Sequence, residues 1–540
     1  AGYAYNYYLK DSISTSTNKE YIVVFQPKNK KELAFQGTMH IDSASLALTS
    51  ITANLSNTAN INFIQKLGFK QSFSPYNNKW VFNNQYTVVN LHASKTENTN
   101  GSFFITKTAD YSIADTSIAT LNITPNQQDS FSVALDSLKN SRPIKVANAI
   151  ADILINKYIH TGVIDWGPVN LLSSHNSVEG YRFTLGARTG KKLCENFTVG
   201  GYVGYGIADD TWKYGGEVQY RFKKTNFAVV GIKYNNNMYQ TDFDYHDQIR
   251  HENYVGNGLG DISTLLFQQY NTIYNQRKNT EIFFDKQWFK GINTHIALSA
   301  NRYLPNLLVP FQQASTNIPF IQNYTFTLGV RLSYKQRILD EFFHRIFLSN
   351  FYPTTQLVVQ AGNYHTTLTS NYYLKLHAST KQTILLGNVG KFRYLLEAGT
   401  ILGQVPYPLL EIYNGYENNG LNRYAFHPSY STQYATDSYV NLHSNIVFNG
   451  LLFNHIPLIN ALNLRETAGI KIAYGSLQTK NRTAMDLPAY IQALNKPYIQ
   501  LSAGIANIFK ILALEYCWDF LPTKSPNVNW GIQARLYIDF

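Results

Sequence analysis

The side chains best suited to bind a metal ion gather in one stretch between residues 239 and 278. Its ligand-type residues are His246, His251, Asp242, Asp244, Asp247 and Glu252. Imidazole and carboxylate groups can together hold a divalent cation. The two histidines, however, stand five positions apart rather than at the i, i+4 spacing of a metal-binding helix. We therefore favour solvated loop charge over a metal site, and no metal ligand is predicted.

The chain lacks the short motifs that mark common enzyme and cofactor sites. It contains no G-x-S-x-G elbow, no H-E-x-x-H helix, no phosphate-binding loop with its lysine and no dinucleotide-binding fingerprint. The glycines of 256–260 lack both the preceding strand and the following lysine that phosphate binding needs. We therefore expect no catalytic residue and no cofactor, and a protein that is not an enzyme.

Another set of ionisable residues alternates with apolar ones. Between 212 and 222 the even positions are mostly aromatic or aliphatic, whereas Lys213, Glu217 and Arg221 occupy odd positions. The segments 512–520 and 532–540 show the same division. Because successive side chains of a strand point to opposite faces, each segment has one apolar and one polar face. A soluble sandwich would bury the apolar face, whereas a membrane barrel would turn it to lipid and keep the charges in its lumen.

The charges on the polar faces are the candidate functional residues. The predicted lumen-facing set is Arg182, Lys213, Glu217, Arg221, Glu515, Asp519, Arg535 and Asp539. Opposite charges on neighbouring strands can pair and fix the shape of a barrel, and the same groups can tune the passage of a solute. We favour the structural role, because a hydrated lumen holds charge at little cost.

About sixteen segments have the length and alternation of barrel strands. They lie near 158–166, 179–189, 197–207, 212–222, 226–238, 279–289, 292–303, 324–334, 354–363, 372–383, 390–403, 435–448, 464–475, 497–508, 511–520 and 529–540. When alternate connections are assigned to one side, the long ones all fall together, at 239–278, 304–323, 404–434 and 476–496. Most others are short, as in outer-membrane barrels. Two do not fit, 335–353 and 449–463, and both look partly helical.

Composition agrees with a membrane barrel. Aromatic residues make up 14% of the chain and charged residues 15%, against about 25% charged residues in ordinary globular domains. No window approaches the ~18 consecutive apolar residues of a membrane-spanning helix. The formal charge of +12 forms no long basic stripe, which argues against nucleic acid as a partner. Cys194 and Cys517 are too few for a disulfide framework.

Residues 1–157 form a different domain. Short alternating runs from Tyr21 to about Thr124 predict antiparallel strands, and helical periodicity around 131–157 predicts a closing helix. Strands followed by a helix look similar to the curved half-barrels of lipoprotein carriers, in which an apolar groove would bind an acyl chain or a partner strand. The residues that would line it are Ile51, Leu55, Ile61, Phe63 and Ile64. We prefer the alternative that they form an ordinary apolar core.

Several segments carry a resemblance to a known family. They are 35–43, 178–184, 200–218, 403–413 and 448–467. The chain resembles the Bacteroidota outer-membrane proteins of domain-of-unknown-function family five-six-eight-six, often called carboxypeptidase-like regulatory domain-containing. Members usually begin with a signal peptide and a small β-sandwich, so this chain looks like the C-terminal part of a longer precursor. The resemblance implies a barrel with a periplasmic module, but it implies no reaction and no catalytic residues. The last residues, 537–540, also resemble the C-terminal signal of outer-membrane barrels.

The expected protein is therefore all-β: an antiparallel transmembrane β-barrel of about sixteen strands over 158–540, preceded by the periplasmic module. We expect it in the outer membrane of a Gram-negative bacterium, in contact with lipid and lipopolysaccharide and able to bind outer-membrane protein or lipoprotein partners. Two functions stay open. One is a transport or envelope-biogenesis component that handles a lipid, polypeptide or solute. The other is a structural or interaction subunit with a plugged barrel. An open lumen favours the first and a plugged lumen the second.

Overall fold

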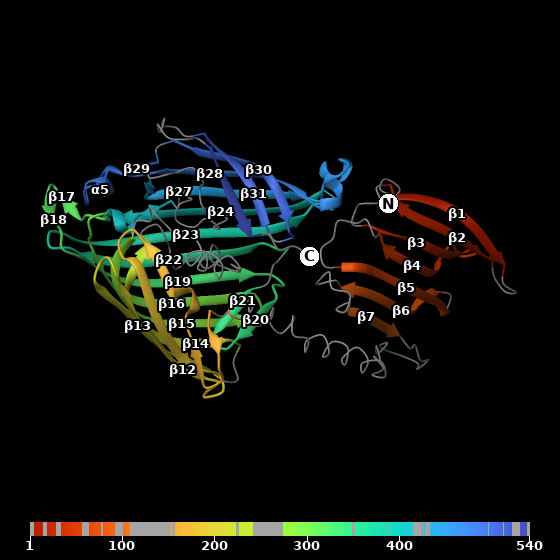
Figure 1. Cartoon of the computed structure of the whole chain (residues 1–540), viewed down its shortest axis with the longest axis horizontal. Coiled ribbons are helices and arrows are strands. Elements are labelled where there is room, and N and C mark those ends of the chain that lie inside the picture. Colours follow the sequence, from red (N-terminus) through yellow and green to blue (C-terminus); the bar gives the residue numbers. More distant parts are fainter. Residues whose placement is uncertain are drawn as a thin grey trace. The chain divides into compact units, whose positions relative to one another are not determined.

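The computed structural model divides into two compact units by its internal contacts (Figure 1). The first comprises Ala1–Ala149, Asn449–Arg465 and Ile538–Phe540, and the second comprises Ile150–Phe448 and Glu466–Tyr537. The structure describes residues 5–14, 19–28, 34–56, 64–76, 79–91, 101–108, 153, 157–222, 226–240, 274–347, 351–387, 389–413, 424, 426, 433–494, 496–510, 512–520 and 530–536. Each unit is considered by itself.

The first unit contains a seven-stranded antiparallel sheet in which each strand pairs with its neighbours in sequence. Its strands are β1 (Tyr5–Ser14), β2 (Lys19–Pro27), β3 (Phe35–Asp42), β4 (Leu48–Leu55), β5 (Ile64–Tyr76), β6 (Lys79–Leu91) and β7 (Gly101–Thr108). Phe25 and Leu55 are buried, and the rings of Phe35 and Phe69 meet edge to face at 5.2 Å. The predicted antiparallel strands are confirmed, whereas the helix predicted over 131–157 lies almost wholly outside the described residues.

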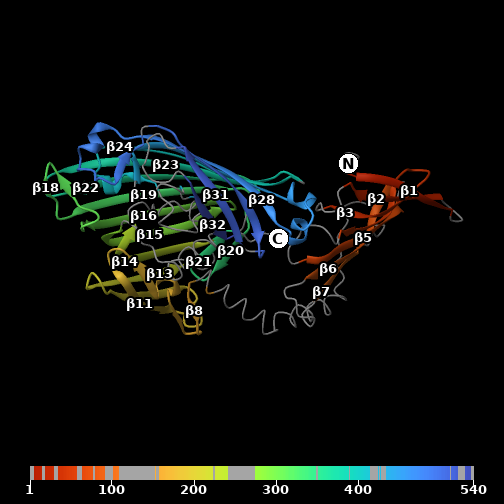
Figure 2. The same cartoon turned by 45° about the horizontal axis from the view of Figure 1, so that its top comes forward.

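The second unit is a curved wall of fifteen long strands, each hydrogen-bonded to the next in chain order (Figure 2). The strands are β11 (Gly180–Thr189), β12 (Phe197–Gly206), β13 (Thr211–Arg221), β14 (Ala228–Gln240), β15 (Tyr274–Phe289), β16 (Ile292–Leu304), β19 (Ile321–Ser333), β22 (Thr354–His365), β23 (Ser370–Leu385), β24 (Gly390–Gly403), β27 (Ser438–Phe448), β28 (Arg465–Ser476), β30 (Tyr498–Ile508), β31 (Leu512–Phe520) and β32 (Trp530–Leu536). All of them were predicted from the alternation of their residues.

The first and last long strands are linked by short strands. The elements there are β8 (Ile159–His160), β9 (Ile164–Trp166) and β10 (Ser173–Asn176). Both β9 and β10 pair with β11, and β8 lies beside β32 in the sheet order; within the described residues β11 and β32 do not pair directly. The single strand predicted over 158–166 is therefore wrong. The chain reverses at Gly162, whose φ of +108° favours glycine.

The two faces of the wall differ in polarity. On β13, Trp212, Tyr214 and Tyr220 are exposed, while Lys213 between them is 1% exposed. Strand β31 repeats the pattern, with exposed Leu, Trp and Phe side chains alternating with buried Ala, Glu, Cys and Asp. A wall with an apolar exposed face and a polar inner face is that of a transmembrane β-barrel. In the described part of the chain, no helix is long and apolar enough to cross a membrane.

The connections differ between the two ends of the wall. The end with the tight turns 190–196, 290–291, 386–389 and 509–511 is called the short-turn end, and the opposite end is the long-loop end. Two connections at the short-turn end are longer. The first, predicted to be partly helical, is instead the hairpin β20 (Ile338–Glu341) and β21 (His344–Phe347). The second does contain two short 3-10 helices, η6 (Phe453–His455) and η7 (Ile459–Leu462).

Candidate functional site

The structure describes the side chains of six of the eight predicted lumen-facing charges. Four of the six are buried, namely Arg182, Lys213, Glu515 and Asp519, and two are half-buried, namely Glu217 and Arg221. All six lie on the face opposite the exposed apolar residues. The side chain of Arg535 and the whole of Asp539 lie outside the described residues. A role for these charges in solute passage stays a prediction.

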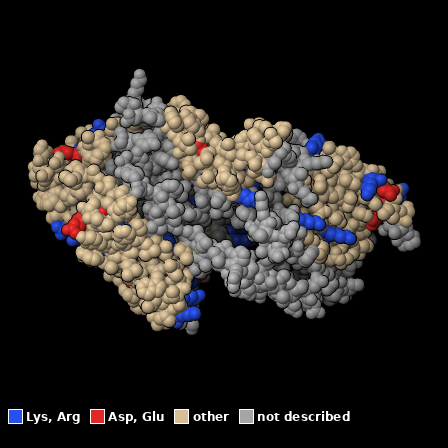
Figure 3. Space-filling model, in the orientation of Figure 1, with Lys and Arg blue, Asp and Glu red and all other residues tan. Residues whose placement is uncertain are grey.

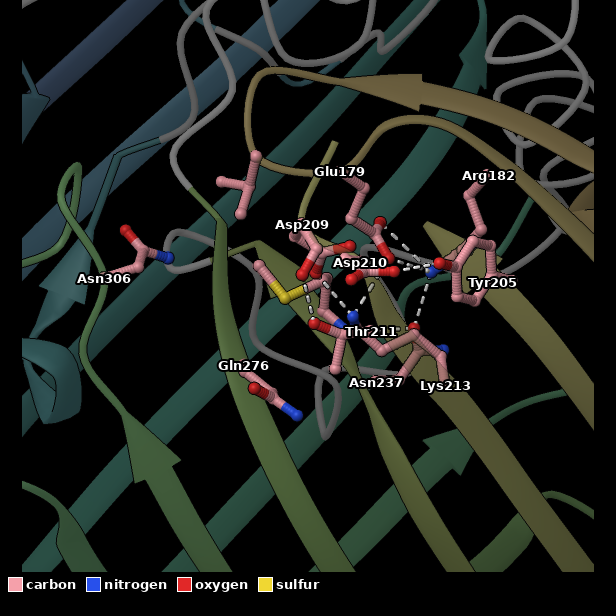
Figure 4. A network of polar contacts seen from close by, with 12 residues as sticks. Glu179, Arg182, Tyr205, Asp209, Asp210, Thr211, Lys213, Asn237, Gln276 and Asn306 are labelled. Atoms are coloured by element: carbon pink, nitrogen blue, oxygen red, sulfur yellow. Dashed lines mark hydrogen bonds and ion pairs between the residues drawn. The ribbon is translucent and has the colours of Figure 1, made fainter. Parts of the chain in front are cut away.

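Two of the predicted residues belong to a buried ionic network near the long-loop end of β11 and β13 (Figure 4). Glu179 is fully buried, 3.3 Å from Arg182 and 3.6 Å from Lys213. Lys213 also lies 2.6 Å from Asp209, and Arg182 donates a hydrogen bond of 2.7 Å to Asn237. Two cations therefore face two carboxylates. Such a neutral group stabilises one arrangement of the wall, since removing either partner would leave a buried charge uncompensated.

Further polar contacts continue along the inner face. Glu515 accepts hydrogen bonds from Asn445 on β27, at 3.0 Å, and from Thr467 on β28. On the opposite part of the wall, Lys233 forms an ion pair of 2.8 Å with Glu281. Charges at this depth require water or close partners, because an isolated ion in an apolar medium is very costly. The described inner face of the wall is therefore largely polar.

The hairpin β20–β21 folds back onto this inner face at the short-turn end. Arg345 donates hydrogen bonds to Asn293, at 2.7 Å, and to Gln287. Arg221 of the wall donates in return to the main-chain oxygen of Phe342 at 2.7 Å. Phe343 packs against an apolar patch of the inner wall. The hairpin is thus held by wall residues from β13, β15 and β16.

The patch that receives Phe343 is one of the apolar parts of the inner face. It consists of Phe227, Val229, Phe283 and Ala297. Cation–π contacts surround it, with the guanidinium of Arg345 4.3 Å and that of Arg221 5.2 Å from the ring centre of Phe227. Burial lowers the pKa of Arg345, and its hydrogen bond to Asp340 opposes that shift. The site therefore combines desolvated guanidinium groups with aromatic rings.

The long-loop end is covered by a second folded layer. Buried side chains from three connections form its apolar core, among them Phe311, Tyr407 and Met485. Strands β25 (Glu411–Ile412), β26 (Gln433–Thr436) and β29 (Ile491–Ala493) join two of these connections in one small sheet. We call this layer the loop cap.

Hydrogen bonds between its segments hold the loop cap together. The Tyr407 hydroxyl donates to Pro310 O at 2.9 Å, and that of Tyr490 donates to Leu308 O at 2.7 Å. Asn481 donates to Asp437 at 2.7 Å. Burial raises the pKa of both tyrosines well above the ordinary value, so both stay neutral donors.

The loop cap also reaches inner wall residues. Tyr413, Phe426 and Tyr434 form an apolar cluster with Tyr439 and Tyr498, which lie on the buried faces of β27 and β30. Folded segments therefore contact the inner face at both ends of the barrel. The sequence did not indicate either cover.

Metal-binding groups are not assembled within the described residues. No cluster of three or more His, Cys, Asp or Glu side chains that could hold a metal ion occurs among them. The stretch around His246 and His251 lies outside the described residues, as does that of the glycines at 256–260. Neither Cys194 nor Cys517 forms a disulfide bond within the described residues.

Solved structures with some likeness to this chain are barrel proteins of outer membranes. BamA from Haemophilus ducreyi lacking POTRA domains 1-3 has a TM-score of 0.40 and 9% identity, over 67% of this chain and 68% of that one. CdiB from Acinetobacter baumannii has a TM-score of 0.36 and 10% identity, over 67% and 57%. Pseudomonas aeruginosa OccK10 (OpdN) has a TM-score of 0.27 and 11% identity, over 66% of this chain and 92% of that one. These likenesses are too loose to support an inference about function.

Sequence comparison gives a firmer result. No curated protein matches the chain. A model of the family of unknown function DUF5686 matches residues 1–110, and the model of that family's C-terminal domain matches residues 156–482. The two matches follow the two kinds of sheet in the structure, the first over β1–β7 and the second over most of the barrel wall. The chain therefore belongs to family DUF5686.

Proposed function

We propose that the protein is an outer-membrane barrel that handles a lipid, polypeptide or solute in transport or envelope biogenesis, with its lumen closed at rest. In this proposal the sheet of the first unit lies in the periplasm. The protein contacts outer-membrane lipid and lipopolysaccharide, has protein or lipoprotein partners and catalyses no reaction.

The observation that carries the proposal is a polar, charged inner face against which the hairpin β20–β21 and the loop cap fold. Buried polar groups such as Glu281 and Glu515 suit the polar lining that a path for a hydrated client requires. The hairpin β20–β21 is held to the wall by hydrogen bonds, an ion pair between Arg221 and Asp340, cation–π contacts and the packing of Phe343, all of them noncovalent. A few such interactions can be exchanged for contacts with a client.

A second candidate, a structural or interaction subunit with a permanently plugged barrel, is favoured by the loop cap. Twelve buried residues of the loop cap pack with four of the wall strands in one apolar core, which resembles a folded layer more than a movable gate. The two candidates differ in what happens when the covers are loosened.

Ion conductance across planar bilayers tests the proposal. The double variant Phe343→Ala/Arg345→Ala removes the two main anchors of the hairpin. Its matched control, Phe351→Ala/Arg337→Ala, removes the same side-chain types from exposed positions of the same connection. We expect low conductance from the unaltered protein and the control, and clear channel openings from the anchor variant.

The loop cap requires a further variant, because it could keep the barrel closed by itself. Tyr407→Ala removes the fully buried ring at the centre of its core. If neither the anchor variant nor its combination with Tyr407→Ala conducts, while both still fold, the covers do not gate a path. The plugged structural subunit would then be the better description.

A further inference from the structure

Lysines and large apolar side chains share the turns of the short-turn end. At the short-turn end of β15, the Lys286 ammonium lies 3.7 Å from the ring centre of Trp288, and Lys290 is exposed in the turn that follows. Trp288 is 45% exposed, and its indole N–H donates to Thr294 at 2.9 Å. The ring is therefore fixed in orientation while one side stays open.

Other turns at this end repeat the combination. After β19, the Lys335 ammonium lies 5.1 Å from the ring centre of Tyr334 and 5.9 Å from that of Tyr352, and both rings are exposed. Between β30 and β31, Phe509 is 87% exposed and precedes the exposed Lys510. Three separate turns thus place an aromatic ring and an ammonium group together at the rim.

The charge of the short turns is one-sided. Within the described parts of 190–196, 290–291, 386–389 and 509–511, four lysines stand against one acidic residue. They are Lys191, Lys192, Lys290 and Lys510, against Glu195. At the long-loop end, the exposed carboxylates of Asp210 and Asp486 lie among the exposed Lys278, Lys480 and Lys496. The two ends therefore differ in their acidic residues, which are almost absent from the tight turns of the short-turn end.

Aromatic rings prefer the boundary between hydrocarbon and water, where their apolar body faces acyl chains. An ammonium group beside such a ring lies at the depth of lipid phosphates. There it gains electrostatic attraction if those lipids carry net negative charge. A lysine is a compact, flexible point charge and suits phosphates of varying position. The apolar outer face of the wall continues directly into these turns, so the occupant of the rim is lipid.

We infer that the short-turn end binds the headgroups of anionic phospholipids, through a rim of lysine–aromatic pairs centred on Lys286, Trp288, Lys335 and Lys510. The rim thereby selects its neighbouring lipids and marks the short-turn end as the one that meets an anionic leaflet. This inference does not depend on transport through the lumen.

Quenching of a single tryptophan by brominated lipids tests the inference. One variant keeps only Trp288, and a second keeps only Trp212, which is exposed near the long-loop end of β13; the remaining tryptophans become Phe. Each is placed in bilayers of phosphatidylcholine with a minor share of phosphatidylglycerol, one of the two being brominated. We expect phosphatidylglycerol to be enriched several-fold around Trp288 and about equally distributed around Trp212. One lysine near such a surface contributes up to about fivefold.

Lysine variants then separate the rim from general lipid contact. Lys286→Gln/Lys290→Gln should reduce the enrichment at Trp288, whereas Lys278→Gln should leave it unchanged. Lys278 is exposed near the opposite end of the same strand, which makes it the matched control. Should the double variant fail to fold, the protein with its lysines unaltered is measured in 1 M salt instead. The Debye length is then about 3 Å, and this screening should reduce the same enrichment. Equal quenching by both lipids at Trp288, or equal enrichment at Trp288 and Trp212, would overturn the inference.

Discussion

Replacing one apolar residue on the outer face with arginine measures whether that face meets lipid. Ile232 is the best position, because it is 46% exposed near the middle of β14 and pairs with the exposed Val218 and Ile282 on both sides. Four residues separate it from the strand's short-turn end. At ~3.3 Å per residue and a strand tilt near 40°, this places Ile232 about 10 Å into an apolar band about 25 Å tall.

Arginine at this depth should lower the free energy of unfolding by about 2–4 kcal/mol. The control is Gln219→Arg, because Gln219 is half-buried on the inner face and pairs with Gly231, the residue next to Ile232. Both substitutions therefore introduce the same group at nearly the same depth. In a hydrated chamber the control should cost much less.

Urea titration of the folded protein in lipid vesicles, followed by the gel mobility of the folded barrel, measures both values. Equal losses for Ile232→Arg and Gln219→Arg would refute the assignment of the two faces. The choice of control matters. Alternation alone also places Ala513 on the inner face, but this residue is fully buried between Val447 and Ala506, where an arginine would clash.

Three further outcomes are expected. Lys213→Met should lower the free energy of unfolding by about 3–5 kcal/mol, because it leaves the carboxylate of Glu179 buried with less compensation. Chemical denaturation measures this loss, and a much smaller loss would contradict the importance of the network. NMR titration should give Asp42 a pKa below 3.8, since hydrogen bonds from Ser45 favour its charged form. These hydrogen bonds contribute to stability above pH 3.8, and their contribution disappears as the pH falls through the lowered pKa. Asp42→Asn should abolish this pH dependence. Cysteine placed at the exposed Ser315, without the two native thiols, should react with an impermeant reagent on intact cells, whereas cysteine at the exposed Gly387 should not; the reverse pattern would invert the topology.

The wall could be predicted from the sequence because it depends on a local property. A strand with one apolar and one polar face repeats every two residues, so its position follows from a few neighbours. Strand β24 was predicted at 390–403 and is found there, and β16 differs from its prediction by one residue. The same period places the charges of β13 and β31 on the inner side.

The ionic partners were harder to predict. Arg182 and Lys213 lie on strands and could be assigned to a face, but their carboxylate partners Glu179 and Asp209 lie in turns outside the strands. Alternation over the predicted strand 179–189 places Glu179 on the face opposite Arg182, which is wrong, and it says nothing about Asp209, because a turn has no fixed period. The predicted set therefore contained the cations of this network without the groups that neutralise them.

The covers depend on contacts between residues far apart in the chain, which explains why alternation could not reveal them. The hydrogen bond from Arg221 to Phe342 spans 121 positions, and that from Tyr407 to Pro310 spans 97. The residues that anchor the hairpin look like a partly helical connection in the sequence, because their partners belong to other strands. If the proposed function holds, the charges of the inner face that neighbours neutralise would not by themselves decide what passes. The long-range contacts that hold the two covers would then control access, and a client or partner would have to act on them.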